Sequence, residues 1–179
     1  MNRNELAEKI YQTAHLDGHF TLRSGQISNE YFDKYLFESD PKVLAEIARQ
    51  MVRLIPVGTE ILAGLEMGGI PIATALSIQT GIPAVFVRKK AKEYGTCKLA
   101  EGTDVRGKNV CIIEDVVTTG GQIVLSAKDL RQFGAQIKNV ICVIERDTKS
   151  RDNLIKDELE LIAKNNANFS FSDYNCNIK

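Results

Sequence analysis

Several common classes of protein are excluded by what this sequence of 179 residues lacks. It has only two histidines and four cysteines, and no two cysteines have the CxxC spacing typical of zinc sites. We therefore expect no zinc site built from protein side chains. Neither GxGxxG nor GxxxxGKS/T occurs, so dinucleotide-binding and P-loop functions have no motif to support them.

Charge and hydrophobicity exclude two further classes. Lysine and arginine number 23, aspartate and glutamate also number 23, and no overall basic field would attract nucleic acid or an anionic membrane. No apolar run approaches membrane-spanning length, and the N-terminus lacks a basic-then-apolar signal. We expect a cytoplasmic protein that binds neither nucleic acid nor membrane, with only local anion-binding sites.

The pattern of apolar residues predicts the fold class. From about residue 41 to 146, amphipathic helical stretches alternate with short apolar runs at 61–63, 84–87, 110–113 and 140–144. This alternation predicts an α/β fold with a mainly parallel central sheet flanked by helices. The length suits a single domain over residues 1–179. A helix at about 3–16 and an alternating, aromatic, hairpin-like excursion precede the sheet.

The chain is organised around the run from Val110 to Gln122. Its apolar first part predicts a strand buried on both faces, and Glu114 and Asp115 follow at the carboxyl end. Ligands of open α/β sheets bind outside the carboxyl ends of the strands. These two acids therefore stand where chemistry is usually done, although a turn with surface acids would give the same pattern.

A loop of small residues comes next, and it predicts a phosphate site. Thr118, Thr119, Gly120 and Gly121 leave backbone N–H groups accessible at the start of a predicted helix. Adjacent carboxylates repel a bare phosphate but accept hydrogen bonds from vicinal hydroxyls. The ligand should therefore carry a diol beside a phosphate, as ribose 5-phosphate does.

Three other segments allow two interpretations each. The glycine-rich turn at 64–69 could hold an anion or only pack tightly. Arg88, Lys89, Lys90 and Lys92 begin a polar segment, about 88–102, that is either a solvated face or a mobile loop closing over a polyanion. Arg146 ends an apolar strand and could form a structural salt bridge or bind a ligand.

Residues 114–122 closely resemble the signature of type I phosphoribosyltransferases, which bind phosphoribosyl pyrophosphate. A second pattern resembles the N-terminal hood of the orotate phosphoribosyltransferase family: Phe20-x-Leu22-x-Ser24-Gly25-x-x-Ser28-x-x-Tyr31-x-Asp33. The basic segment resembles the catalytic loop of that family at Arg88, Lys89, Lys92 and Gly95. The sequence departs from the family at Gly68, where some members have lysine, and at Tyr94, where many have histidine.

The resemblance implies a fold, a reaction and a site. The fold is the type I phosphoribosyltransferase fold, with a small hood from about 18–36. The reaction is transfer of the phosphoribosyl group to orotate, giving orotidine 5′-monophosphate and pyrophosphate in pyrimidine biosynthesis. Mg²⁺ would be held mainly by the substrate rather than by protein side chains. A homodimer would share the catalytic loop between subunits.

The site residues implied by the resemblance fall into three groups. The catalytic group is Lys89, Lys92 and Asp115. Phosphoribosyl pyrophosphate would contact Arg88, Lys89, Lys92, Tyr94, Glu114, Asp115, Val116, Val117, Thr118, Thr119, Gly120, Gly121 and Gln122. Orotate would contact Arg23, Tyr31, Phe32, Thr118 and Arg146. Two alternatives stay open: a phosphoribosyltransferase for another base, and a non-enzymatic regulator that senses phosphoribosyl pyrophosphate.

Overall fold

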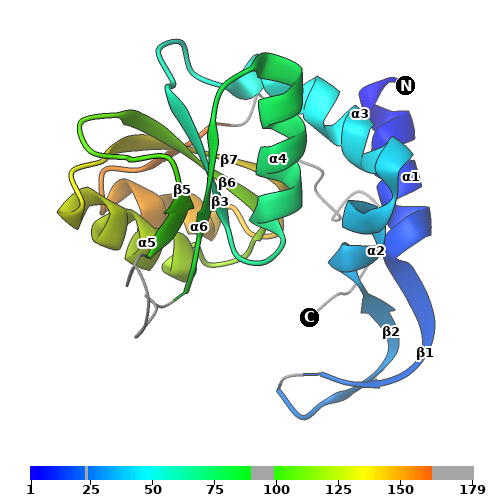
Figure 1. The fold of residues 1–179 in the computed structure, drawn as a ribbon. Coiled ribbons are helices and arrows are strands. Elements are labelled where there is room, and N and C mark those ends of the chain that lie inside the picture. Colours follow the sequence, from blue (N-terminus) through cyan, green and yellow to red (C-terminus); the bar gives the residue numbers. More distant parts are fainter. Residues whose placement is uncertain (23, 90–98, 163–179) are drawn as a thin grey trace.

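A six-stranded sheet forms the centre of the protein (Figure 1). The computed structural model describes residues 1–22, 24–89 and 99–162. The strands lie in the order β5-β4-β3-β6-β7-β8. Their bounds are β3 Ile61–Leu65, β4 Ala84–Val87, β5 Ala100–Gly102, β6 Asn109–Val117, β7 Gln136–Glu145 and β8 Glu160–Leu161. All neighbouring pairs are parallel except β4 with β5, which confirms the predicted α/β fold and mainly parallel sheet.

Helices cover both faces of the sheet because its central strands are apolar on both sides. On β6, Val110 and Ile112 belong to one buried cluster, whereas Cys111 and Ile113 belong to the other. The first cluster packs against α5 (Gly121–Gln132) and α6 (Lys149–Ile155). The second packs against α1 (Arg3–Ala14), α3 (Pro41–Met51) and α4 (Gly69–Thr80). A 3₁₀ turn, η1 (Val52–Leu54), follows α3.

The N-terminal excursion is a two-stranded antiparallel hairpin that extends away from the sheet and its helices (Figure 1). Its strands are β1 (His15–Thr21) and β2 (Ile27–Phe32), and we call this hairpin the hood. The short helix α2 (Lys34–Ser39) begins directly after β2, with Asp33 as its N-cap. Phe32 and Phe37 pack in the cluster that covers the sheet, so this end of the hood is anchored in the core.

One expectation was wrong in part. Residues 100–102 were assigned to the loop that begins at 88, but they form β5 and pair with β4. Two causes are visible: β4 would otherwise expose the hydrogen-bonding groups of an edge strand, and the buried Leu99 anchors the returning chain. The remaining part of that loop, 90–98, lies outside the described residues.

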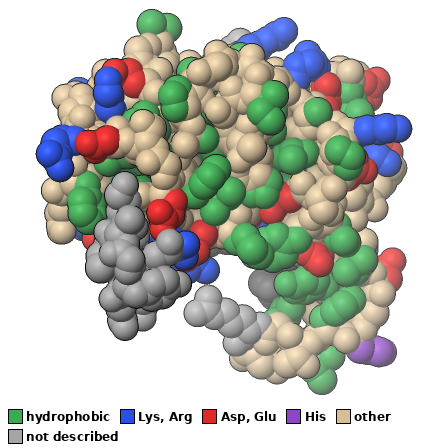
Figure 2. All heavy atoms as spheres, in the orientation of Figure 1, with side chains coloured by type: hydrophobic (Ala, Val, Ile, Leu, Met, Phe, Trp, Pro, Cys, Tyr) green, Lys and Arg blue, Asp and Glu red, His purple; other side chains and the backbone are tan. Residues whose placement is uncertain are grey.

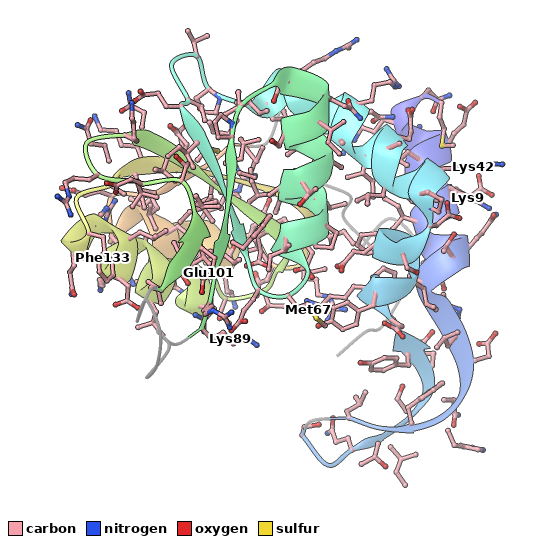
Figure 3. All side chains as sticks on the ribbon, viewed as in Figure 1. Lys9, Lys42, Met67, Lys89, Glu101 and Phe133 are labelled. Atoms are coloured by element: carbon pink, nitrogen blue, oxygen red, sulfur yellow. The ribbon has the colours of Figure 1, made fainter. Side chains whose placement is uncertain are left out.

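The topology places four of the predicted ligand-facing segments at one edge of the sheet. Strands β3, β4, β6 and β7 are parallel, so their carboxyl ends meet at that edge. The turn after Leu65, the basic segment at Arg88, the threonine–glycine loop at Thr118 and the residue Arg146 all follow these ends. In Figure 3, Met67, Lys89 and Glu101 lie along this edge, on the side toward the hood.

Candidate active site

The structure distinguishes the two acids that follow the central apolar run. Glu114 is half-buried, whereas Asp115 is completely buried, with an exposed fraction of 0%. The backbone N–H of Val116 donates a hydrogen bond to Asp115 Oδ1, and the N–H of Asp115 donates to Glu114 Oε1 at 3.2 Å. The pair is therefore held by its own strand, and only Glu114 is directly open to solvent.

Two residues of helix α2 complete the acid pair. The Nζ atom of Lys34 forms an ion pair with Asp115 Oδ2. Glu38, one helical turn further along α2, is buried, and its carboxyl group lies beside that of Asp115. We call Lys34, Glu38, Glu114 and Asp115 the acid cluster. It joins the helix that follows the hood to the central strand.

The turn between β3 and α4 makes room for the acid cluster. A Cβ atom on Gly68 would overlap Asp115 Oδ2 and would lie 2.7 Å from Glu38 Oε1. The absence of a side chain at residue 68, which the sequence showed only as a departure from the family pattern, is thus required by the contacts of Asp115. The preceding peptide bond, between Glu66 and Met67, is cis.

Burial and mutual contact separate the pKa values of the three acids. Burial, with the neighbouring Asp115 carboxylate, raises the pKa of Glu114 to about 9 and that of Glu38 to about 8. Burial alone would also raise the pKa of Asp115, but hydrogen bonds from Glu114 and Lys34 outweigh it and lower that pKa. The cluster therefore favours the ionised form of Asp115, paired with the Lys34 ammonium, and the protonated forms of Glu38 and Glu114.

This charge state decides what the cluster can bind. The half-buried Glu114 can meet the hydroxyl groups of a ligand directly, whereas Asp115, with an exposed fraction of 0%, lies behind it and holds it in place. The acid cluster does not suit Mg²⁺, because Asp115 is paired with Lys34 and the protonated form is favoured at Glu38 and Glu114. In the part of the chain that the structure describes, no three His, Cys, Asp or Glu residues are grouped to hold a metal ion.

The threonine–glycine loop has the backbone geometry of an anion site. Helix α5 begins at Gly121, and its N-cap residue Gly120, at φ +77°, contributes no side chain to cap the first turn. Thr118 and Thr119 are exposed. The Nδ2 atom of Asn153, on α6, donates to the carbonyl of Thr119 at 3.0 Å and fixes the loop. Accessible amides of a helix N-terminus favour a phosphate group at this point.

The basic segment starts at the same edge. The Nε atom of Arg88 lies 3.4 Å from Glu101 Oε1 on β5, and the backbone N–H of Lys89 donates to the carboxylate of Glu66. Lys89 points away from the sheet in Figure 3. Figure 2 shows acidic and basic side chains together along this lower edge of the molecule. Lys92 and Tyr94 lie outside the described residues.

Arg146, directly after β7, lies against the base of the hood at the same edge of the sheet. The guanidinium carbon of Arg146 lies 5.9 Å from the centre of the Phe32 ring, and Tyr31 and Asp115 are its electrostatic partners. Glu145 is bound by Arg151, with two contacts of 2.8 Å. Within residues 1–22, 24–89 and 99–162, no carboxylate forms an ion pair with the exposed Arg146. Arg23 lies outside the described residues.

Lys34 and Glu38 were missed by the sequence analysis. A lysine and a glutamate four residues apart are typical of a solvent-exposed helix face, so the spacing gave no signal of a buried cluster. The useful signal was Gly68, whose departure from the resembled pattern marks the place where the Asp115 carboxylate leaves no room for a side chain.

The pKa of Glu38 predicts a pH-dependent stability. Below about pH 4.5 both folded and unfolded chains carry its proton, whereas between 4.5 and about 8 only the unfolded chain ionises. Glu38 therefore destabilises the folded state increasingly as pH rises through this window. Glu38→Gln, which keeps a hydrogen-bond donor, should remove the penalty. Urea unfolding should show the variant gaining relative to the parent between pH 5.5 and 7.5, by at most about 1.4 kcal/mol per pH unit.

The matched control for this measurement is Glu8→Gln on the exposed face of α1. The difference in unfolding free energy between Glu8→Gln and the parent should not rise with pH as it does for Glu38→Gln. A difference between Glu38→Gln and the parent that stays constant over the same pH range would show that Glu38 is ionised in the folded protein.

Comparison with known proteins gives the family. The phosphoribosyl transferase domain model matches residues 38–175. An orotate phosphoribosyltransferase of Nocardioides sp. is 55% identical over 156 residues, covering 87% of each chain. One of Methanocella arvoryzae is 43% identical over 151 residues, covering 84% of this chain and 86% of the relative.

Solved structures agree with these relatives. The crystal structure of Mycobacterium tuberculosis H37Rv orotate phosphoribosyltransferase with Fe(III) dicitrate has a TM-score of 0.80 and 31% identity, covering 89% of this chain and 93% of that chain. The same enzyme in complex with phosphoribosyl pyrophosphate has a TM-score of 0.75 and 28% identity, covering 89% and 92%. The chain therefore belongs to the orotate phosphoribosyltransferase branch of the phosphoribosyltransferase family.

Proposed function

We propose that the protein transfers the 5-phosphoribosyl group from phosphoribosyl pyrophosphate to orotate, forming orotidine 5′-monophosphate and pyrophosphate for pyrimidine synthesis. One observation carries the proposal: the acid cluster and the uncapped start of α5 lie next to each other at the carboxyl end of β6. An acceptor for hydroxyls beside a site for phosphate matches a ribose 5-phosphate. Relatives that are 55% and 43% identical to this chain are orotate phosphoribosyltransferases.

The phosphoribosyl group would be held by the motif of residues 114–122. Glu114, with the buried Asp115 behind it, would receive the ribose hydroxyls, and Thr118, Thr119, Gly120 and Gly121 would receive the 5-phosphate. Val116, Val117 and Gln122 complete the lining. Fixing the ribose at both ends leaves its C1 atom at a defined position, which converts the reaction with orotate into a step between oriented groups.

At C1 the bond to the pyrophosphate oxygen breaks, the bond to N1 of orotate forms, and the N1 proton passes to the departing pyrophosphate or to water. Positive charge develops on the ribosyl group, and the ionised Asp115 stabilises it by its field. Negative charge develops on the leaving pyrophosphate, where Arg88, Lys89 and Lys92 act. Mg²⁺ would bind through oxygens of the substrate and water and would neutralise part of the same charge.

Orotate would lie between the hood and the end of β7. Arg146 can bind the orotate carboxylate, and Phe32 and Tyr31 lie on the hood side of Arg146. Arg23 and Thr118 would provide further polar contacts. Because other nucleobases lack this carboxylate, Arg146 would select orotate.

The described helices include none long and apolar enough to cross a membrane. We propose that the enzyme works in the cytoplasm.

The direct test is a spectrophotometric assay of orotate consumption with phosphoribosyl pyrophosphate and Mg²⁺, with uracil, adenine and hypoxanthine in parallel. Only orotate should be consumed. Consumption of another base in its place would support the alternative phosphoribosyltransferase, and no consumption of any base by a folded protein that binds phosphoribosyl pyrophosphate would support a regulator.

The two acids should contribute unequally to catalysis. Asp115→Asn should lower kcat/KM by at least about 100-fold, because it removes the one ionised carboxylate of the cluster. Glu114→Gln should cost less than about tenfold, because Glu114 is already protonated at neutral pH and glutamine keeps its donor. Steady-state kinetics on both variants and on the double variant, with circular dichroism to confirm folding, gives the comparison. Equal losses for the two single variants would contradict the assigned charge state.

Arg146→Leu should impair orotate more than phosphoribosyl pyrophosphate. We expect KM for orotate to rise at least tenfold because a charge-assisted hydrogen bond is lost, with the dissociation constant of phosphoribosyl pyrophosphate within threefold of the parent. Arg53→Leu, an exposed arginine on η1, is the matched control and should change neither. Equal losses for both substrates would mean that Arg146 is only structural.

We further propose a homodimer in which the basic segment serves the active site of the partner. Mixing inactive Lys92→Ala and Asp115→Asn proteins under conditions of subunit exchange should restore activity. A mixed dimer that shares loops has one site with both defects and one with neither, so up to about half of the parent activity per mixed dimer is expected. Proven exchange without recovery would assign each loop to its own chain.

A further inference from the structure

We propose that Lys34 is a positioning residue for the substrate: by its ion pair with the buried Asp115, beside Glu38, it fixes the acid pair Glu114–Asp115 that receives the ribose hydroxyls. The inference rests on the proposed function and extends the site to helix α2. It concerns residues outside the signature motif of 114–122, on the helix that follows the hood.

The first observation is the direction of the two side chains. Lys34 and Glu38 lie four residues apart and share one face of α2. In a surface helix such residues form an ion pair with each other. Here both are directed to Asp115 on β6, Lys34 through an ion pair and Glu38 through a buried carboxyl group that lies beside it. The inward polar face of α2 therefore serves a single carboxylate.

The second observation is the fit of the backbone around this carboxylate. Gly68 lies against Asp115 Oδ2, the same oxygen that Lys34 contacts, and any side chain there would collide with it and approach Glu38 Oε1. Helix α2 and the turn before α4, which are distant from β6 in sequence, thus both contact one oxygen atom at the end of β6. Asp115 Oδ1 is fixed independently by the N–H of Val116. Both oxygens of the carboxylate are held in place.

The third observation is the electrostatic need for Lys34. Asp115 is fully buried and lies beside two other acids, and a buried carboxylate without a cation is unstable. Lys34 is the cation in direct contact, while Arg146 acts on Asp115 without an ion pair. Without Lys34, burial would dominate and the pKa of Asp115 would rise. Asp115 would then become protonated, and the acid pair would lose part of its capacity to accept the ribose hydroxyls.

A purely structural role for Lys34 has to be separated from this one. As a clamp between α2 and β6, Lys34 would contribute stability, and its loss would weaken binding by the same factor at every pH. A positioning role predicts a pH-dependent loss. When Lys34 is removed, raising the pH re-ionises Asp115 and restores substrate binding. The distinguishing readout is therefore the pH profile of binding, not its value at one pH.

The experiment measures the dissociation constant of Mg²⁺–phosphoribosyl pyrophosphate by isothermal titration calorimetry between pH 6 and 8.5. Lys34→Met removes the charge and keeps the apolar stem, Lys34→Arg keeps the charge, and Lys42→Met on α3 is the exposed control. Ratios to the parent cancel the titration of the ligand. We expect Lys34→Met to bind at least tenfold more weakly at pH 6 and within threefold of the parent at pH 8.5. Lys34→Arg should stay within threefold throughout, and Lys42→Met should match the parent.

A ratio for Lys34→Met that is flat with pH, or that stays near one, would overturn the proposal. If Lys34→Met does not fold, Lys34→Gln, which keeps hydrogen-bond donation without charge, gives the same comparison. Binding of phosphoribosyl pyrophosphate by the parent distinguishes failure of the proposed function from failure of the role of Lys34. A parent that binds no phosphoribosyl pyrophosphate rejects the proposed function together with this role, whereas a parent that binds and a flat ratio reject the role of Lys34 alone.

Discussion

The burial of one carboxylate at the edge of the sheet is the constraint on which the site depends. Asp115 stands at the end of the central strand, where solvent cannot stabilise its charge. Its neighbours compensate: Lys34 supplies the cation, Glu38 and Glu114 supply protons, and Gly68 supplies space. Helix α2 cannot move away from β6 without leaving this charge unpaired, so the base of the hood and the sheet are held together at the site.

The sheet topology explains why the other functional groups collect around this carboxylate. Four parallel strands end at the same edge, so each following segment begins there. The start of α5 brings backbone amides, the end of β4 brings cations, and the end of β7 brings Arg146. These amides and cations are all suited to anions, so they match a ligand with a phosphate at one end and a carboxylate-bearing second substrate at the other.

The sequence predicted the architecture and the main motif, but not the environment of the acids. Apolar runs such as Val110–Ile113 announce buried strands because a strand covered on both faces has no polar alternation. The loop from Thr118 to Gly121 was recognisable because its functional residues are consecutive in the sequence. Lys34 and Glu38 were not, since their role depends on a contact across the fold. For the same reason, β5 was missed: its pairing with β4 depends on an edge that only the folded sheet creates.

The raised pKa values of Glu38 and Glu114 resolve a difficulty in binding a polyanion beside three acids. Two unit charges about 5 Å apart repel by about 3 kcal/mol at an effective dielectric constant near 20. Three ionised acids would impose this cost several times on a ligand that carries a phosphate and a pyrophosphate. With two acids protonated and the third paired to Lys34, the cluster has almost no net charge. It can then accept hydrogen bonds from the ribose without repelling the phosphates on either side, while keeping one carboxylate to face the positive charge that develops at C1.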